Sequence, residues 1–116
     1  MKKFFYLSTC TTCKNIMKEL DLSDFELQDI KSNPLTAEQL EYLKNLAGSY
    51  ESLFSRRAQL YKKLGLKDQA LTEDDYKKYL LEHYTFLKRP VLVNNTEIFI
   101  GSSSKTKESL KEHFGK

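Results

Sequence analysis

A change of hydrophobic periodicity near the amino terminus limits the folds that this chain can adopt. Phe4–Leu7 is a continuous apolar run, the pattern of a strand that is covered on both faces. Ile16, Met17 and Leu20 then recur at helical spacing. The strand must give way to a helix within the segment Ser8–Cys13, which holds the only two cysteines of the chain. A strand that leads directly into a helix predicts an α/β fold.

The following residues predict a second strand and then a helix. Phe25 and Leu27 alternate with polar residues, which indicates a strand, and Asn33-Pro34 then breaks the chain. The best-marked helix covers residues 36–47. Thr36 and Gln39 can form a capping box at its start, and Gly48 can end it.

Further helical patterns continue to about residue 84, after which the periodicity returns to that of strands. Two apolar runs, 91–93 and 98–100, are separated by Asn94-Asn95, which predicts a hairpin. A last helix is expected after Ser102–Ser104. We therefore predict a single domain of residues 1–116, with a mixed sheet and a helical insertion at about residues 34–84.

Charge and composition exclude several classes of protein. The net charge of +3 is mild, and acidic and basic residues are interleaved, so we expect no direct binding of nucleic acid. No apolar run approaches the length of a membrane span, and the amino terminus is unlike a signal peptide. We expect a cytoplasmic protein with no membrane association. In a reducing cytosol, two closely spaced cysteines indicate chemistry more than a structural disulfide.

The spacing of Cys10 and Cys13 indicates a redox pair. If Cys10 lies just before the helix, its sulfur meets backbone amides that lack partners, and these amides favour the reactive thiolate. Cys13, one turn into the helix, is then the natural resolving thiol. Thr11 and Thr12 would add backbone amides for an anionic substrate.

Two other interpretations of the cysteines were weighed. A zinc site needs two more ligands, and the only histidines, His83 and His113, lack the close paired spacing of such a site, so we expect no metal. Burial of both cysteines as small apolar side chains is disfavoured by their polar neighbours. Redox or thiol-transfer chemistry is the preferred interpretation.

An oxyanion substrate would also need arginines, because the planar guanidinium matches an oxyanion. Arg56, Arg57 and Arg89 are the only arginines of the chain. A surface ion pair is the ordinary role of a single arginine. Arg89 is the strongest candidate, because Pro90 follows it and invites a cis peptide bond at the start of a strand.

The chain resembles the ArsC/Spx family, whose members have a thioredoxin-like fold. The resemblance rests on three segments in order: CTTC at residues 10–13, SRRAQLYKKLGL at 55–66 and FLKRPVLV at 86–93. It implies that Cys10 is the nucleophile and that Arg89, directly before Pro90, contacts the anion.

At the remaining positions, the family pattern differs between a reductase branch and an Spx-like branch. The reductase pattern implies an arginine at Ser55, whereas the Spx-like pattern implies Arg57, with Arg56 close enough to substitute. Gly101 stands where the reductases use a further arginine, as in the Spx-like branch. Cys13 is also a feature of that branch.

The resemblance implies an arsenate reductase-like thiol–disulfide oxidoreductase without a bound cofactor. Cys10 would attack an oxidised substrate, Cys13 would resolve the intermediate, and glutathione, glutaredoxin or thioredoxin would restore the thiols. The alternative is a redox-sensing transcriptional regulator that binds the α subunit of RNA polymerase. A thioredoxin-like module without a catalytic task is a third hypothesis.

Overall fold

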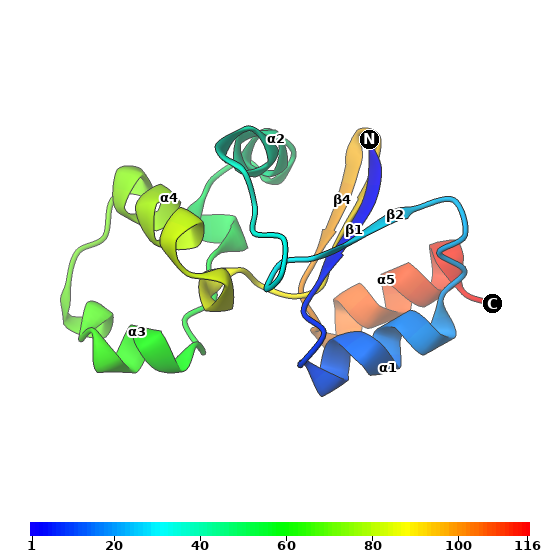
Figure 1. Ribbon diagram of the computed structural model, residues 1–116, viewed down its shortest axis with the longest axis horizontal. Coiled ribbons are helices and arrows are strands. Elements are labelled where there is room, and N and C mark those ends of the chain that lie inside the picture. Colours follow the sequence, from blue (N-terminus) through cyan, green and yellow to red (C-terminus); the bar gives the residue numbers. More distant parts are fainter. The chain divides into compact units, whose positions relative to one another are not determined.

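The computed structural model describes all residues from Met1 to Lys116. The chain forms two compact units, one of residues 1–33 and 89–116 and the other of residues 34–88. The first unit contains β1 (Lys2–Tyr6), α1 (Thr11–Glu19), β2 (Glu26–Asp29), β3 (Val91–Asn94), β4 (Glu97–Ile100) and α5 (Ser104–Phe114) (Figure 1). The second contains α2 (Ala37–Ala47), η1 (Glu51–Leu53), α3 (Gln59–Lys63), η2 (Leu66–Asp68), α4 (Glu73–Glu82) and η3 (Tyr84–Phe86). This order confirms the predicted α/β class.

The first unit is built on a four-stranded mixed sheet with the strand order β2-β1-β3-β4. β1 runs parallel to β2 and antiparallel to β3, and β3 and β4 form the predicted hairpin. Asn95, in the turn of this hairpin, has a φ of 58°, a conformation that asparagine tolerates better than most residues. The apolar run at the amino terminus is a central strand, as predicted.

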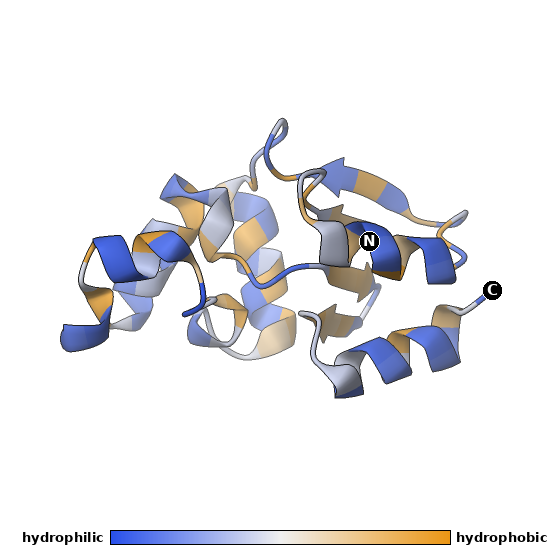
Figure 2. Ribbon diagram, turned by 90° about the horizontal axis from the view of Figure 1, so that it is seen from below, coloured by the Kyte–Doolittle hydropathy of each residue, from blue (hydrophilic) through white to orange (hydrophobic).

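The two helices of the first unit cover one face of the sheet (Figure 1). Their shared core contains side chains from β1, α1, β3 and α5: Phe4, Ile16, Leu20, Leu92 and Leu110. Phe5 and Val91, which point to the opposite face, are also fully buried. In Figure 2 the helices alternate between hydrophilic and hydrophobic residues, as expected for helices with one face on a core.

The second strand, β2, does not bury the side chains that its sequence pattern predicted. Leu27 is 47% exposed, whereas Gln28 is only 4% exposed. β2 is an edge strand that pairs only with β1, so its apolar side chain is incompletely covered. The Gln28 side-chain amide donates a hydrogen bond of 2.9 Å to the carbonyl oxygen of Asn33, which offsets the cost of burying that group.

The carboxyl terminus is fastened to the end of α1. The amide of Asp21 donates to the carbonyl oxygen of Phe114 at 2.7 Å, and the amide of Lys116 donates to that of Glu19 at 3.1 Å. The ring of Phe114 makes edge-to-face contacts with Phe25 and Phe99. α5 therefore holds α1 at its carboxyl-terminal end, opposite to the cysteines.

The second unit is helical, and its two longest helices begin with capping boxes. In α2 the hydroxyl of Thr36 accepts from the amide of Gln39, and the side chain of Gln39 accepts from the amide of Thr36. Thr72 and Asp75 do the same for α4. Gly48 ends α2 with a φ of 98°, a conformation that is strained for other residues.

An aromatic cluster occupies the centre of the second unit. The rings of Phe54 and Phe86 stack with centroids 4.9 Å apart, and Tyr76 meets Phe54 edge-to-face at the same distance. The amide of Ser55 donates to the carbonyl oxygen of Phe86, and the amide of Lys88 donates to that of Leu53. Residues 53–55 and 86–88 therefore pair in an antiparallel bridge beside these rings. Tyr76 and Tyr79 of α4 therefore serve in packing.

No helix in the chain is both long and apolar enough to cross a membrane. The prediction of a single domain, with an insertion at about residues 34–84, stays a prediction.

The core and the edge of the sheet should respond differently to the same truncation. We expect Leu92→Ala to lower the free energy of unfolding by about 2–5 kcal/mol, because it leaves a cavity at a fully buried position. Leu27→Ala, in the exposed edge strand, should change it by about 0.5 kcal/mol or less. Urea denaturation followed by circular dichroism measures both. Equal losses in the two variants would contradict this assignment of the core.

Candidate active site

Cys10 is the residue at which a turn becomes helix α1. The amide of Cys10 donates to the carbonyl oxygen of Leu7 at 3.0 Å, closing the turn that follows β1. Cys10 itself has extended backbone angles, φ −93° and ψ 111°, and its carbonyl accepts the first helical hydrogen bond, from Lys14. It is therefore the N-cap residue, directly before the helix as predicted. Its side chain is partly exposed, so a substrate can reach the sulfur.

The surroundings of Cys10 favour the thiolate. Burial raises the pKa of this thiol, but other interactions outweigh it and hold the pKa below its ordinary value. The backbone N–H and the thiol of Cys13 lower this pKa, and Arg89 lowers it by its positive charge and as a hydrogen-bond donor. Cys10 occupies the N-cap position, although its side chain makes no capping hydrogen bond.

Cys13 has the opposite properties. Its side chain is fully buried, and this burial raises the pKa of its thiol to about 11, although the Leu7 amide and the charge of Arg89 act in the other direction. The hydrogen bond to Cys10 and the negative charge of that sulfur raise the pKa further. The pKa values of the two thiols are therefore shifted in opposite directions, that of Cys10 down and that of Cys13 up.

Arg89 reaches this pair from the start of β3. The peptide bond between Arg89 and Pro90 is cis, as the sequence suggested. The carbonyl oxygen of Pro90 accepts a hydrogen bond of 2.8 Å from the amide of Gly101, which joins this segment to the end of β4. Gly101 has a φ of 86°, which a residue with a side chain rarely adopts.

Thr11 and Thr12 are the first two residues of α1, and both are exposed. The amides at these positions have no acceptor within the helix, so they are available to an anion at the helix start. Together with Cys10, Cys13 and Arg89, they form the candidate site of the first unit.

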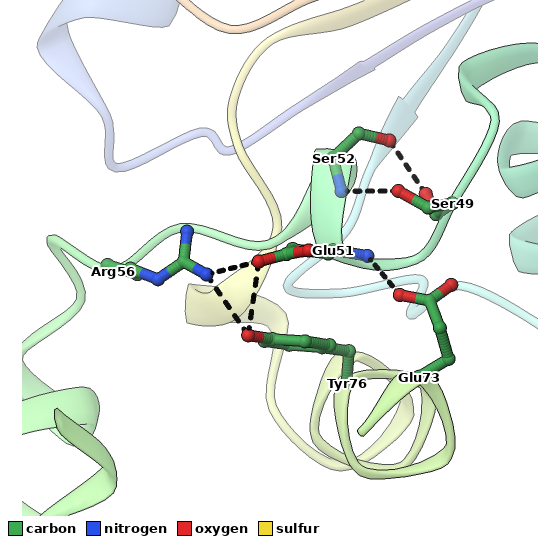
Figure 3. A network of polar contacts seen from close by, with 6 residues as sticks. All are labelled: Ser49, Glu51, Ser52, Arg56, Glu73 and Tyr76. Atoms are coloured by element: carbon green, nitrogen blue, oxygen red, sulfur yellow. Dashed lines mark hydrogen bonds and ion pairs between the residues drawn. The ribbon is translucent and has the colours of Figure 1, made fainter. Parts of the chain in front are cut away.

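Arg56, in the second unit, is already engaged in a network of polar contacts (Figure 3). One guanidinium nitrogen lies 2.6 Å from a carboxylate oxygen of Glu51 and donates to the hydroxyl of Tyr76 at 3.0 Å. The other carboxylate in the network, that of Glu73, accepts from the amides of Tyr50 at 2.8 Å and Glu51 at 3.0 Å. The hydrogen bond to Glu51 is the main cause that raises the pKa of Arg56.

The neighbouring Arg57 differs from Arg56. Its backbone amide donates to the hydroxyl of Ser55 at 3.3 Å, and its side chain is exposed. No ion pair or hydrogen bond holds its guanidinium. Of the two arginines of the second unit, Arg57 keeps its charge uncompensated.

Asp29 is a residue of this region that the sequence analysis did not single out. One of its carboxylate oxygens accepts from the amide of Ser8 at 3.3 Å and from the amide of Lys31 at 3.2 Å. A hydrogen bond from the side chain of Ser8 is the main cause that holds the pKa of Asp29 below its ordinary value, and the amides of Lys31 and Ser8 lower it further. An aspartate at the end of a strand is common, and only the parallel pairing of β1 and β2 places it beside the turn before Cys10.

No group of three or more histidine, cysteine, aspartate or glutamate side chains is arranged to hold a metal ion. His83 packs against Phe86 in the second unit, and His113 contacts the carbonyl oxygen of Ser109 in α5. The two histidines are separate packing residues.

Comparison with known proteins places this geometry in a family. A sequence model described as the ArsC family matches residues 5–110. The regulatory protein MgsR of Bacillus subtilis is 28% identical over 102 residues, which are 84% of this chain and 80% of that protein. The global transcriptional regulator Spx of Streptococcus mutans is 24% identical over 104 residues, 87% of this chain and 76% of that protein.

Solved structures agree with the family match. A structure titled as a possible arsenate reductase, from Streptococcus mutans UA159, has 30% identity and a TM-score of 0.72, over 96% of this chain and 98% of that chain. An ArsC family related protein from Bacteroides fragilis has a TM-score of 0.76 with 24% identity, over 95% and 97% of the two chains. The predicted thioredoxin-like fold and the predicted resemblance are confirmed.

The thiol of Cys10 should titrate below its ordinary pKa of about 8.5, and Cys13 above it. The rate of alkylation by iodoacetamide follows the thiolate, so the rate at Cys10 should rise as the pH increases through the lowered pKa. Arg89→Ala should raise that pKa, because it removes a positive charge and a hydrogen bond. Mass spectrometry of the labelled peptide measures the profile.

Lys88→Ala is the matched control, since it removes a neighbouring cation that does not act on Cys10. A wild-type profile centred at or above about 8.5 would contradict the assignment.

Proposed function

Because this chain belongs to the ArsC family, we propose that it is an arsenate reductase-like thiol–disulfide oxidoreductase in which Cys10 is the nucleophile and Cys13 the resolving thiol. The observation that supports this most directly is the position of Cys10 as N-cap of α1, where Cys13 and Arg89 lower the pKa of its thiol. The thiolate is the form that attacks.

In the first step the Cys10 thiolate attacks one sulfur of a disulfide substrate. A new bond forms between Cys10 and that sulfur, the substrate disulfide breaks, and the other substrate sulfur leaves as a thiolate. Arg89 lies beside the reacting sulfur and would offset negative charge during the attack. The amides of Thr11 and Thr12 would do the same for an anionic group at the helix start.

In the second step Cys13 attacks the Cys10 sulfur and releases the rest of the substrate as a thiolate. The proton of Cys13 passes to the leaving thiolate or to water. Once Cys10 is in a mixed disulfide it no longer carries the negative charge that raises the pKa of Cys13, so Cys13 ionises more easily at the stage that needs it. The substrate has gained two electrons, and the chain holds a Cys10–Cys13 disulfide.

An external thiol would return the pair to the reduced state, with no bound cofactor. Reductases of the ArsC family draw on such donors, and we propose glutathione, glutaredoxin or thioredoxin in the cytoplasm for this chain. Two electrons pass from the donor to the Cys10–Cys13 disulfide, which closes the cycle.

The same site suits an oxyanion such as arsenate, if a second arginine supports Arg89. We assign that role to Arg57 in preference to Arg56, because Glu51 already compensates the charge of Arg56. The departures at Ser55 and Gly101 from the reductase pattern make a disulfide the preferred substrate.

The alternative function is that of a redox-sensing regulator that binds the α subunit of RNA polymerase. The relatives named MgsR and Spx support it, because they match most of this chain and are described as regulators. In such a protein the thiol pair would be a switch that changes a binding surface.

Turnover of a disulfide separates these functions. With thioredoxin and its reductase as donor, we expect the wild type to reduce a small disulfide, and Cys10→Ser to abolish this activity. Cys13→Ser should retain the first step and accumulate a mixed disulfide at Cys10, visible as an added mass. Absence of turnover, together with binding of the α subunit that depends on the thiol state, would instead favour the regulator.

The two arginines of the second unit should differ in their effect on an anionic substrate. Arg57→Ala should lower kcat/KM for arsenate or oxidised glutathione by about tenfold or more, the loss of one charge-assisted hydrogen bond. Arg56→Ala should lower stability slightly, by about 1 kcal/mol or less because its ion pair is half exposed, and leave kcat/KM nearly unchanged. The reverse order of effects would exclude Arg57 from the site.

A further inference from the structure

The turn that carries Cys10 is held at its centre by a single side chain. The hydrogen bond from the amide of Cys10 to the carbonyl oxygen of Leu7 makes Ser8 and Thr9 the central residues of this turn. The amide of Ser8 points away from that hydrogen bond and donates to Oδ1 of Asp29 at 3.3 Å. The Ser8 amide is therefore held by a side chain from another strand.

Asp29 is itself fixed on β2. It pairs with Tyr6 in the parallel register of β1 and β2, and the next residue, Ile30, donates its amide to the carbonyl oxygen of Tyr6 at 2.9 Å. The oxygen that accepts from Ser8 also accepts from the amide of Lys31 at 3.2 Å. The backbone around Asp29 therefore fixes the orientation of the carboxylate that contacts the turn.

The turn connects Asp29 with both sulfurs. Leu7, its first residue, places an amide beside the Cys13 sulfur, and Cys10 is its last residue. A shift of Ser8 would move Cys10 relative to the first turn of α1, because no side-chain capping hydrogen bond fixes Cys10 at the helix start.

We propose that Asp29 is a positioning residue for the reactive thiol: through the Ser8 amide, it keeps the Leu7–Cys10 turn in the geometry that places the Cys10 sulfur on the first turn of α1. This inference rests on the proposed function, since it concerns the same nucleophile. Asp29 touches neither sulfur and takes no part in the chemical steps. Its effect is on the proportion of molecules in which Cys10 is held as a thiolate.

Three variants test this role. Asp29→Ala removes the acceptor, whereas Asp29→Asn keeps an oxygen that can accept from Ser8 and Lys31. Asp21→Ala is the matched control, because Asp21 makes the same kind of local contact, accepting from the amide of Ser23 at 3.2 Å and from its hydroxyl at 2.8 Å, beyond the opposite end of α1. The readouts are the pH profile of Cys10 alkylation and the thermal midpoint of each variant.

We expect Asp29→Ala to move the Cys10 profile toward the ordinary thiol value and to slow alkylation at pH 6 by about threefold or more, the effect of a rise of about half a pKa unit. Asp29→Asn should restore most of the wild-type profile. Asp21→Ala should lower the thermal midpoint without moving the profile. This combination separates positioning of the thiol from a general loss of stability.

Two results would overturn the proposal and leave the proposed function intact: a lowered wild-type pKa that Asp29→Ala does not change, or an equal shift in Asp21→Ala. A wild-type Cys10 without a lowered pKa would instead remove the basis of the proposed function.

Amide hydrogen exchange of the wild type covers the case in which Asp29→Ala does not fold. A Ser8 amide that exchanges much more slowly than that of the exposed Thr9 supports the contact with Asp29. Equal, fast exchange of the two amides overturns it.

Discussion

The position of Cys10 directly before the first turn of α1 is the constraint on which the proposed chemistry of this chain depends. A helix start leaves amides without partners, and most proteins satisfy them with a serine, threonine or aspartate oxygen. Here Cys10 stands at the N-cap, and Cys13 in the first turn lowers the pKa of its thiol, which favours the thiolate that the proposed mechanism needs. The N-cap residue of the helix and the proposed nucleophile are therefore the same residue. The sheet and the turn at Leu7–Cys10 position that helix start, while α5 holds the opposite end of the helix.

Much of this arrangement could be predicted from local patterns. The capping box at Thr36, the glycine after α2 and the hairpin at Asn94-Asn95 follow from nearest neighbours along the chain, so the sequence alone located them. Cys10 could be placed as well, because a strand run and a helical spacing met there. The cis bond before Pro90 was only suggested, since both isomers are compatible with the sequence.

The features that escaped prediction depend on strand pairing or on distant partners. The alternation of β2 indicated a strand but could not reveal that an edge position exposes Leu27 and buries Gln28. Arg56 and Arg57 are adjacent and identical in the sequence, and only the approach of Glu51 and Tyr76 distinguishes them. Asp29 lies 21 residues from Ser8 along the chain, and their contact exists only because β1 and β2 run parallel. Each of these required knowledge of which segments meet.

The different depths of the two sulfurs also set the order in which reagents can reach them. Cys10 is partly open to solvent, while Cys13 has no exposed surface. An oxidant, a metal ion or a disulfide that approaches from solution encounters one sulfur only, and the other is reached from inside the protein, by way of the first. If Cys13 resolves Cys10 as proposed, an oxidised Cys10 has a protected thiol beside it that can form a disulfide with it before oxidation goes further.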